Sequence, residues 1–208
     1  MSSLFSYSKA VIDLFFPHYC AACFSNIISS KQLLCTECFS KLEETDFFKK
    51  ENNLLEQKFA GRIPIQAAGS SYFFTKHSVI QTLIHQLKYK GNKEIGLFLG
   101  KLIGTQLMQS ERFKAIDVIV PVPLHKKRIK QRGYNQSELI AQGIASVIQK
   151  PVRNNFLMRK EFTETQTHKS RISRWQTIQE AFTIDETKKE LLKGRHFLLV
   201  DDVVTTGA

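Results

Sequence analysis

The chain has 208 residues, of which 42% are hydrophobic, and a formal net charge of +11. This length and composition exclude collagen-like and disordered classes and allow one substantial buried core beside a small module. The positive charge favours phosphates, nucleic acid or anionic surfaces as partners, although solubility alone accounts for it equally well. The apolar run at residues 10–16 is interrupted by Asp13, so it lacks the continuous core of a signal peptide. We therefore expect a cytoplasmic protein with no membrane span.

Two C-x-x-C pairs, with eleven residues between them, contain all four cysteines of the chain: Cys20, Cys23, Cys35 and Cys38. Such pairs supply four thiolates at the spacing that a tetrahedral zinc site requires. Disulfides are not expected in a reducing cytosol, and a redox dithiol explains one pair better than two. Because four thiolates leave no open coordination position, we predict a structural zinc, with His18 outside the ligand set.

Composition divides the chain into two predicted domains. The cysteine pairs belong to a small zinc-ribbon-like module over residues 1–55, and we interpret the polar run 49–53 near its end as a linker. A second, larger domain is predicted over residues 61–208.

The larger domain shows strand and helix patterns in alternation. Strands are predicted at residues 65–74, 116–122, 152–158, 181–184 and within 196–204, and helices at 79–89, after Gly91, and at 137–148. The run 116–122 is apolar except for Asp117, as in a buried parallel strand. This order predicts an α/β fold with a doubly wound, mainly parallel sheet.

The end of the chain places an acidic pair and a small polar loop after an apolar run. Asp201 and Asp202 follow Phe197–Val200, and the loop after them contains Thr205, Thr206, Gly207 and Ala208. Hydroxyls and backbone N–H groups of such a loop bind phosphate, and carboxylates accept hydrogen bonds from sugar hydroxyls. The alternative is a strand that ends in a solvated acidic turn, which is common for the acidic pair alone.

This C-terminal segment resembles the phosphoribosyl pyrophosphate (PRPP) motif of type I phosphoribosyltransferases. Further motifs together resemble the ComF/GntX family: Leu87–Gly91, Val120–His125 with Arg128, Arg132–Gln136, and Arg159 with Thr165 and Gln166. That family also has an N-terminal four-cysteine module, so the resemblance spans nearly the whole chain. It implies a type I phosphoribosyltransferase fold and, for some members, a role in DNA uptake during natural competence.

The resemblance also implies roles for particular residues. Asp201 and Asp202 would be the catalytic carboxylates at the ribose hydroxyls, and Thr205, Thr206, Gly207 and Ala208 would bind the 5′-phosphate. The turn at Pro123, Leu124 and His125 matches the position of the pyrophosphate loop. The family's phosphate loop continues with another hydroxyl residue and a helix, so we expect this sequence to hold only part of it.

Six further residues are candidates for phosphate binding or for a hood that closes over the sugar: Arg128, Arg132, Asn135, Arg159, Arg171 and Arg174. Guanidinium groups bind phosphate oxygens in two-point geometry. The alternatives are an ordinary basic helix approach for the first three and a solvated loop for the last three.

Two functions follow from these assignments. The first is binding of PRPP or a related sugar phosphate with Mg²⁺ and, if the protein is active, transfer of phosphoribose to an acceptor with release of pyrophosphate. The second is a non-catalytic, zinc-containing adaptor in DNA uptake, with single-stranded DNA and the competence machinery as partners. The sequence shows no acid/base pair that would activate an acceptor, so the acceptor is not assigned.

Overall fold

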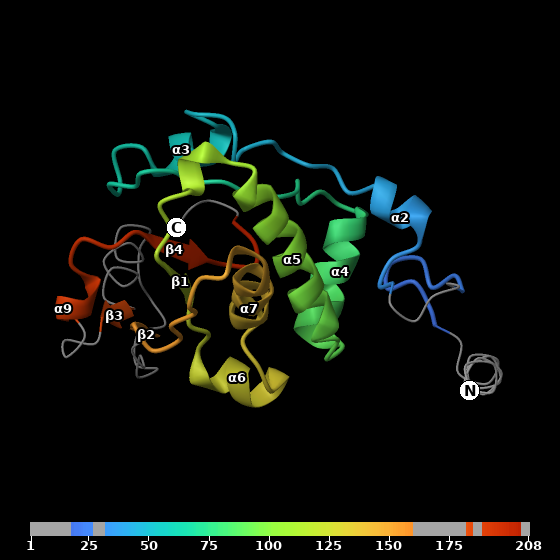
Figure 1. Ribbon diagram of the computed structural model, residues 1–208. Helices are drawn as coiled ribbons and strands as arrows, with labels where there is room; N and C mark the ends of the chain where they lie inside the picture. The colour runs from blue at the N-terminus through green and yellow to red at the C-terminus, as the bar shows by residue number, and fades with distance from the viewer. Residues whose placement is uncertain (1–17, 27–31, 160–181, 185–188, 205–208) are drawn as a thin grey trace, which may run out of the picture.

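The chain folds into a mixed α/β structure in which helices pack beside a small parallel sheet (Figure 1). The computed structural model describes residues 18–26, 32–159, 182–184 and 189–204. Within these ranges the strands form one parallel and one antiparallel pair. The α/β class and the parallel pairing are therefore confirmed, while a full doubly wound phosphoribosyltransferase sheet stays a prediction.

The parallel pair joins the two apolar runs predicted as strands, of which only the first is buried along its whole length. In the second, Phe197 and Leu199 are exposed, so the prediction of a fully buried strand there is wrong. Strand β1 (Val118–Pro121) pairs with β4 (Phe197–Val200), with Val118 opposite Phe197. On its other side β1 contacts the chain near Val152, because the Ile119 N–H donates to the Pro151 carbonyl over 2.9 Å. All four residues of β1 are buried, which explains its uninterrupted apolar sequence.

The three helices expected in the larger domain are present as α4 (Val79–Tyr89), α5 (Glu94–Met108) and α7 (Gln136–Ile148). Helices α5 and α7 approach each other closely because glycines face glycines. A Cβ on Gly143 would lie 2.4 Å from the Leu97 carbonyl oxygen and 2.8 Å from the Gly100 Cα. No larger residue fits here without separating the two helices.

Shorter elements complete the described structure: α2 (Thr36–Ser40), α3 (Leu54–Phe59), the 3-10 helix η1 (Glu111–Phe113), α6 (Lys126–Arg132), β2 (Leu157–Arg159), β3 (Phe182–Ile184) and α9 (Lys189–Leu192). Strands β2 and β3 pair in antiparallel register. The predicted strand at 181–184 is thus confirmed as β3. The one predicted at 152–158 is shorter and later, because only Val152 bridges β1 before β2 begins.

The predicted strand at residues 65–74 is wrong. Its backbone hydrogen bonds go largely to side chains rather than to a neighbouring strand: the Asn53 amide donates to the Ala68 carbonyl over 2.8 Å, and the Ala68 N–H donates to Glu56 over 3.0 Å. Only an isolated bridge forms, between Tyr72 and Glu44. Apolar residues at this segment's ends, including Ile65 and Phe74, are exposed.

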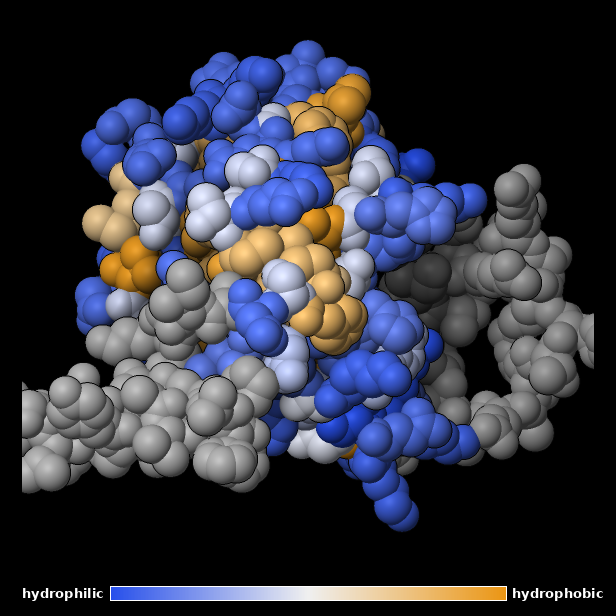
Figure 2. Space-filling model, turned by 90° about the vertical axis from the view of Figure 1, so that its right-hand side faces the viewer, coloured by the Kyte–Doolittle hydropathy of each residue, from blue (hydrophilic) through white to orange (hydrophobic). Residues whose placement is uncertain are grey.

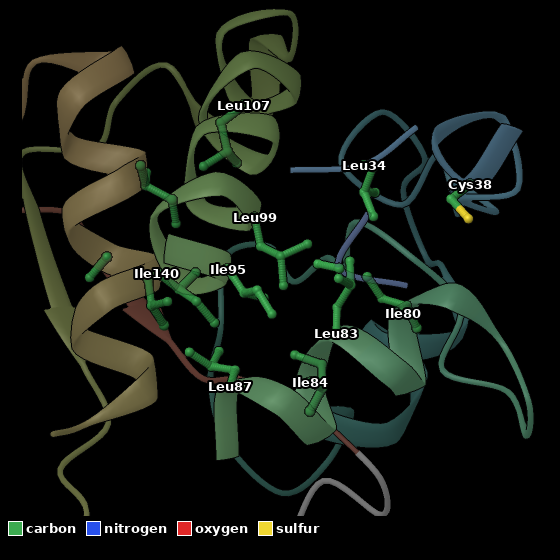
Figure 3. Packing of buried hydrophobic residues seen from close by; sticks show 14 of the residues in the cluster. Leu34, Cys38, Ile80, Leu83, Ile84, Leu87, Ile95, Leu99, Leu107 and Ile140 are labelled. Atoms are coloured by element: carbon green, nitrogen blue, oxygen red, sulfur yellow. The ribbon is translucent and has the colours of Figure 1, made fainter. Parts of the chain in front are cut away.

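The hydrophobic core extends from the cysteine segment into the helices (Figure 3). Leu34 and Cys38 belong to the same buried cluster as Leu83 of α4 and Ile140 of α7. The amide of Gln86 on α4 also donates to the Ala21 carbonyl. The cysteine segment therefore packs directly on α4, while the domain boundaries themselves remain a prediction.

The face on which the cysteine segment and α4 lie is mostly hydrophilic, with an apolar strip through its middle (Figure 2). A bilayer-spanning helix would need a longer apolar stretch than any helix in the described part of the chain provides.

Candidate functional site

The candidate site lies at the carboxyl edge of the parallel sheet. Strands β1 and β4 end side by side, and the Val122 N–H donates to the Val200 carbonyl over 2.9 Å. The turn after β1 and the acidic pair after β4 therefore meet at one edge. In open α/β sheets, ligands bind outside this carboxyl edge.

Asp201 connects the end of β4 to the first turn of α7. Its Oδ1 accepts hydrogen bonds from the Ser137 hydroxyl over 3.0 Å and from the Asp202 N–H over 2.9 Å. The residue is exposed at the edge of the sheet. Ser137 thus fixes the carboxylate while leaving it able to accept further hydrogen bonds.

Asp202 points to the opposite side, toward the end of α4. Its Oδ1 lies 2.8 Å from the Lys88 Nζ, and both side chains are largely buried, at 13% and 21% exposure. Burial raises the pKa of Asp202 above its ordinary value, and the hydrogen bond and positive charge of Lys88 partly oppose this. Lys88 therefore opposes, without cancelling, the effect of burial on this carboxylate.

The residues just before α7 brace the site. The Asn135 amide donates to the Val122 carbonyl over 2.9 Å, while its oxygen accepts from the Ser137 N–H over 3.2 Å and caps α7. The hydroxyl of Tyr134 donates to the Leu87 carbonyl at the end of α4. Asn135 is a candidate for phosphate binding, but both polar atoms of its side chain are used to join the turn after β1 to the start of α7.

Gln136 is a buried polar residue at the same helix start. It is 1% exposed, and its Nε2 has no hydrogen-bond partner among the residues that the structure describes. A buried donor without an acceptor is costly, and the described residues supply no acceptor for this amide.

The predicted pyrophosphate loop forms the half-buried turn between β1 and α6. Within it, His125 caps α6, since its Nδ1 accepts from the Lys127 N–H over 3.1 Å. Gly133 ends α6 with a φ of 79°, a conformation that favours glycine. Pro123 and Leu124 precede the cap and directly follow Val122, whose N–H donates to the last residue of β4.

The predicted basic candidates are not all brought together. Arg128 and Arg132 lie on α6 and line one hollow with Lys88, and the Arg132 guanidinium lies 5.3 Å from the centre of the Tyr89 ring. Arg159 lies on β2, over the Phe182 ring of the antiparallel sheet. Three further groups fall outside the described residues: Arg171, Arg174, and the loop Thr205, Thr206, Gly207 and Ala208.

The four cysteines converge as their spacing predicts. Their sulfur atoms all lie within 4.8 Å of one another, and the Cys23 and Cys35 sulfurs are 3.8 Å apart. Tetrahedral zinc with Zn–S bonds of about 2.3 Å places its sulfurs about 3.8 Å apart, so the cluster fits the metal. Hydrogen bonds from Ser25 lower the pKa of Cys23 to about 6, which favours the thiolate.

Sequence reasoning did not assign Lys88 or Ser137 to the site. Both contact the acidic pair from more than 60 positions away in sequence. The only signal was local: Lys88 falls in the cationic and aromatic run that ends α4, Lys88-Tyr89-Lys90-Gly91, and Ser137 follows an N-cap asparagine.

The chain is similar to several competence and DNA-utilization proteins. It is 28% identical over 202 residues to "Competence protein F" of Haemophilus influenzae, covering 93% of this chain and 88% of that protein. It is 33% identical over 132 residues to "DNA utilization protein YhgH" of Escherichia coli, covering 62% of this chain and 56% of that protein. It is 29% identical over 139 residues to "Competence protein ComFC" of Bacillus subtilis, covering 65% of this chain and 52% of that protein.

The matches to the last two proteins thus span about half of each relative's length. No family model matches this chain. No solved structure matches it either.

Proposed function

We propose that this chain, which belongs to the ComF family by its competence and DNA-utilization homologues, binds a phosphorylated ribose at the carboxyl edge of β1 and β4. The expected ligand is PRPP with Mg²⁺. The observation that carries the proposal is the position of Asp201 and Asp202, just beyond β4 and beside the first turn of α7. Carboxylates accept hydrogen bonds from sugar hydroxyls, and a helix N-terminus favours phosphate.

Phosphoribosyl transfer would break the bond between ribose C1 and a pyrophosphate oxygen and form a bond from C1 to the acceptor. The carboxylates of Asp201 and Asp202 would stabilise positive charge that develops on the ribose, and Arg128 and Arg132 would neutralise the departing pyrophosphate. Bound Mg²⁺ would add charge neutralisation at the pyrophosphate oxygens. Among the described residues we assign none as a base for an acceptor.

Calorimetric titration of the chain with PRPP, with and without Mg²⁺, tests the proposal. Asp202→Asn should weaken Mg²⁺-dependent binding about tenfold or more, since a hydrogen bond to a charged group contributes roughly 1.5–3 kcal/mol. Asp117→Asn is the matched control, because Asp117 lies at the opposite end of β1 and accepts a hydrogen bond from the His196 N–H. The proposal fails if PRPP gives no Mg²⁺-dependent heat, or if both variants bind it as tightly as the parent.

A second candidate function is a non-catalytic adaptor in DNA uptake. Its support is the basic composition of α6 together with the names of the homologues. Arg128, Lys130 and Arg132 lie on one short helix with no acidic residue, which suits the phosphates of single-stranded DNA.

The salt dependence of DNA binding tests the adaptor. Replacing Arg128, Lys130 and Arg132 by Gln should weaken binding of an oligothymidine and reduce the slope of log K against log salt by about 2, at roughly 0.7 per phosphate contact. An unchanged slope would show that these three side chains do not contact the strand.

A further inference from the structure

A hollow of about 580 Å³ lies beside the acidic pair, between the end of α4 and the helix α6. Its size falls within the range of roughly 300–1,000 Å³ that is usual for small-molecule sites. The side chains that matter for its chemistry are Lys88, Tyr89, Lys90, Arg128, Arg132 and Tyr134.

The charges around this hollow are of one sign. Among the described residues, four cationic side chains line it and no carboxylate does. Lys88 is paired with Asp202, which does not itself line the hollow. Lys90 and Arg128 form no ion pair with a carboxylate of the described residues. Convergent cations without local neutralisation favour an anionic ligand, and a guanidinium group matches phosphate oxygens well.

An aromatic ring distinguishes this hollow from a simple phosphate site. Tyr89 is 64% exposed, although most large apolar side chains of α4 are buried. One side of its ring meets the Arg132 guanidinium at 5.3 Å, and the His85 ring one turn earlier lies 4.9 Å away. Phosphate alone gains nothing from an exposed ring, whereas a nucleobase stacks on aromatic and guanidinium planes.

The end of α4, which carries Tyr89, is fixed by burial, a hydrogen bond and an ion pair. Leu87 is fully buried, its carbonyl accepts from the Tyr134 hydroxyl, and Lys88 is tied to Asp202. The ring is therefore presented on a fixed helix end rather than on a mobile loop, which lowers the entropic cost of stacking.

We propose that this hollow binds a nucleoside phosphate, with the phosphate at the cations and the base against Tyr89 and Arg132. The ligand is either a free nucleotide or the 5′-terminal nucleotide of a DNA strand, which share this chemistry. The hollow shares Arg128 and Arg132 with the pyrophosphate end of the proposed sugar-phosphate site, whereas Tyr89 belongs to the hollow alone. It adds recognition of the base to the backbone contacts of the adaptor function.

The first test compares dTMP with ribose 5-phosphate by calorimetry. Tyr89→Leu should weaken dTMP binding roughly tenfold, the loss expected for one stacked base, and leave ribose 5-phosphate unchanged. Tyr89→Phe should retain the affinity for dTMP. Phe74→Leu is the matched control, because it removes an exposed ring beyond the other end of α4.

Oligothymidines with a 5′-phosphate or a 5′-hydroxyl separate the two sources of the ligand. If the phosphorylated strand binds much more tightly than the hydroxyl strand, and its affinity depends on Tyr89, the ligand is a strand end. If only dTMP shows an affinity that depends on Tyr89, the ligand is a free nucleotide. The proposal is overturned if Tyr89→Leu weakens none of these ligands, or weakens ribose 5-phosphate as much as dTMP.

A crosslink in the unaltered chain makes the test independent of any variant's folding. Irradiation with 5-iodo-dUMP should label Tyr89, as mapped by mass spectrometry, and labelling only at other residues overturns the proposal. Asp202→Asn should weaken PRPP binding without weakening dTMP binding, so failure of this site and failure of the sugar-phosphate site are distinguishable.

Discussion

Lys88 and Asp202, 114 positions apart in sequence, form a 2.8 Å ion pair between the last turn of α4 and the residue that follows the end of β4 by two positions. The pair ties the helix that supports the cysteine segment to the carboxylates of the candidate site. Loss of the lysine should therefore change both the pKa of Asp202 and the free energy of unfolding.

Lys88→Met should raise the pKa of Asp202 further, because burial already raises it and the opposing cation is removed. Titration of the Asp202 carboxyl carbon by NMR in both chains measures the change. The result is contradicted if this pKa is the same with and without Lys88.

The raised pKa of Asp202 also gives a pH dependence of stability. The folded chain retains the Asp202 proton above the unperturbed value of 3.8, where the unfolded chain has lost it. The contribution of Asp202 to the free energy of unfolding therefore falls as pH rises through that window, more so in Lys88→Met. Urea unfolding across this range checks the sign, with Lys114→Met, which removes an exposed ion pair, as control.

Gly143→Ala should destabilise the fold by roughly 1–3 kcal/mol, because the added methyl group would press on the α5 backbone at Leu97. Urea unfolding measures the loss, and Gln142→Ala on the exposed face of the same helix should have little effect. Equal stability of the two variants would show that α5 and α7 can separate without cost.

Asn135→Ala should lower the free energy of unfolding by about 1–2 kcal/mol, since it removes the cap of α7 and the bond to the Val122 carbonyl. Asn135→Asp keeps the capping oxygen but loses the amide donor, so its loss should be smaller. If both variants are as stable as the parent, Asn135 has no bracing role and its direct contact with a ligand becomes the better explanation.

Elemental analysis should find one zinc per chain, and Cys35→Ser should lose it together with thermal stability, because the cluster packs on α4 through Leu34 and the Ala21 carbonyl. Chelation of the parent should reproduce the loss. The zinc prediction is contradicted if the metal-free chain has the same thermal stability as the parent. A disulfide between the paired cysteines would favour the redox alternative instead.

The sequence by itself determined features that depend on short-range pattern. The spacing of the cysteines predicted their convergence, helical periodicity predicted α4, α5 and α7, and two continuous apolar runs predicted β1 and β4. The placement of an acidic pair just after an apolar strand also predicted its position at the sheet edge. Each of these rests on residues close together in the chain, where periodicity and chain geometry decide the outcome.

Only the tertiary structure decided which distant residues meet. It paired Lys88 with Asp202 and placed Tyr89 beside Arg132, contacts that depend on how α4 packs against the sheet and α6. It also overturned the strand expected at residues 65–74, where buried side chains such as Asn53 take the backbone hydrogen bonds that a strand would use. Propensity describes what a segment favours alone, and the partners available in the folded chain decide which of its hydrogen bonds are made.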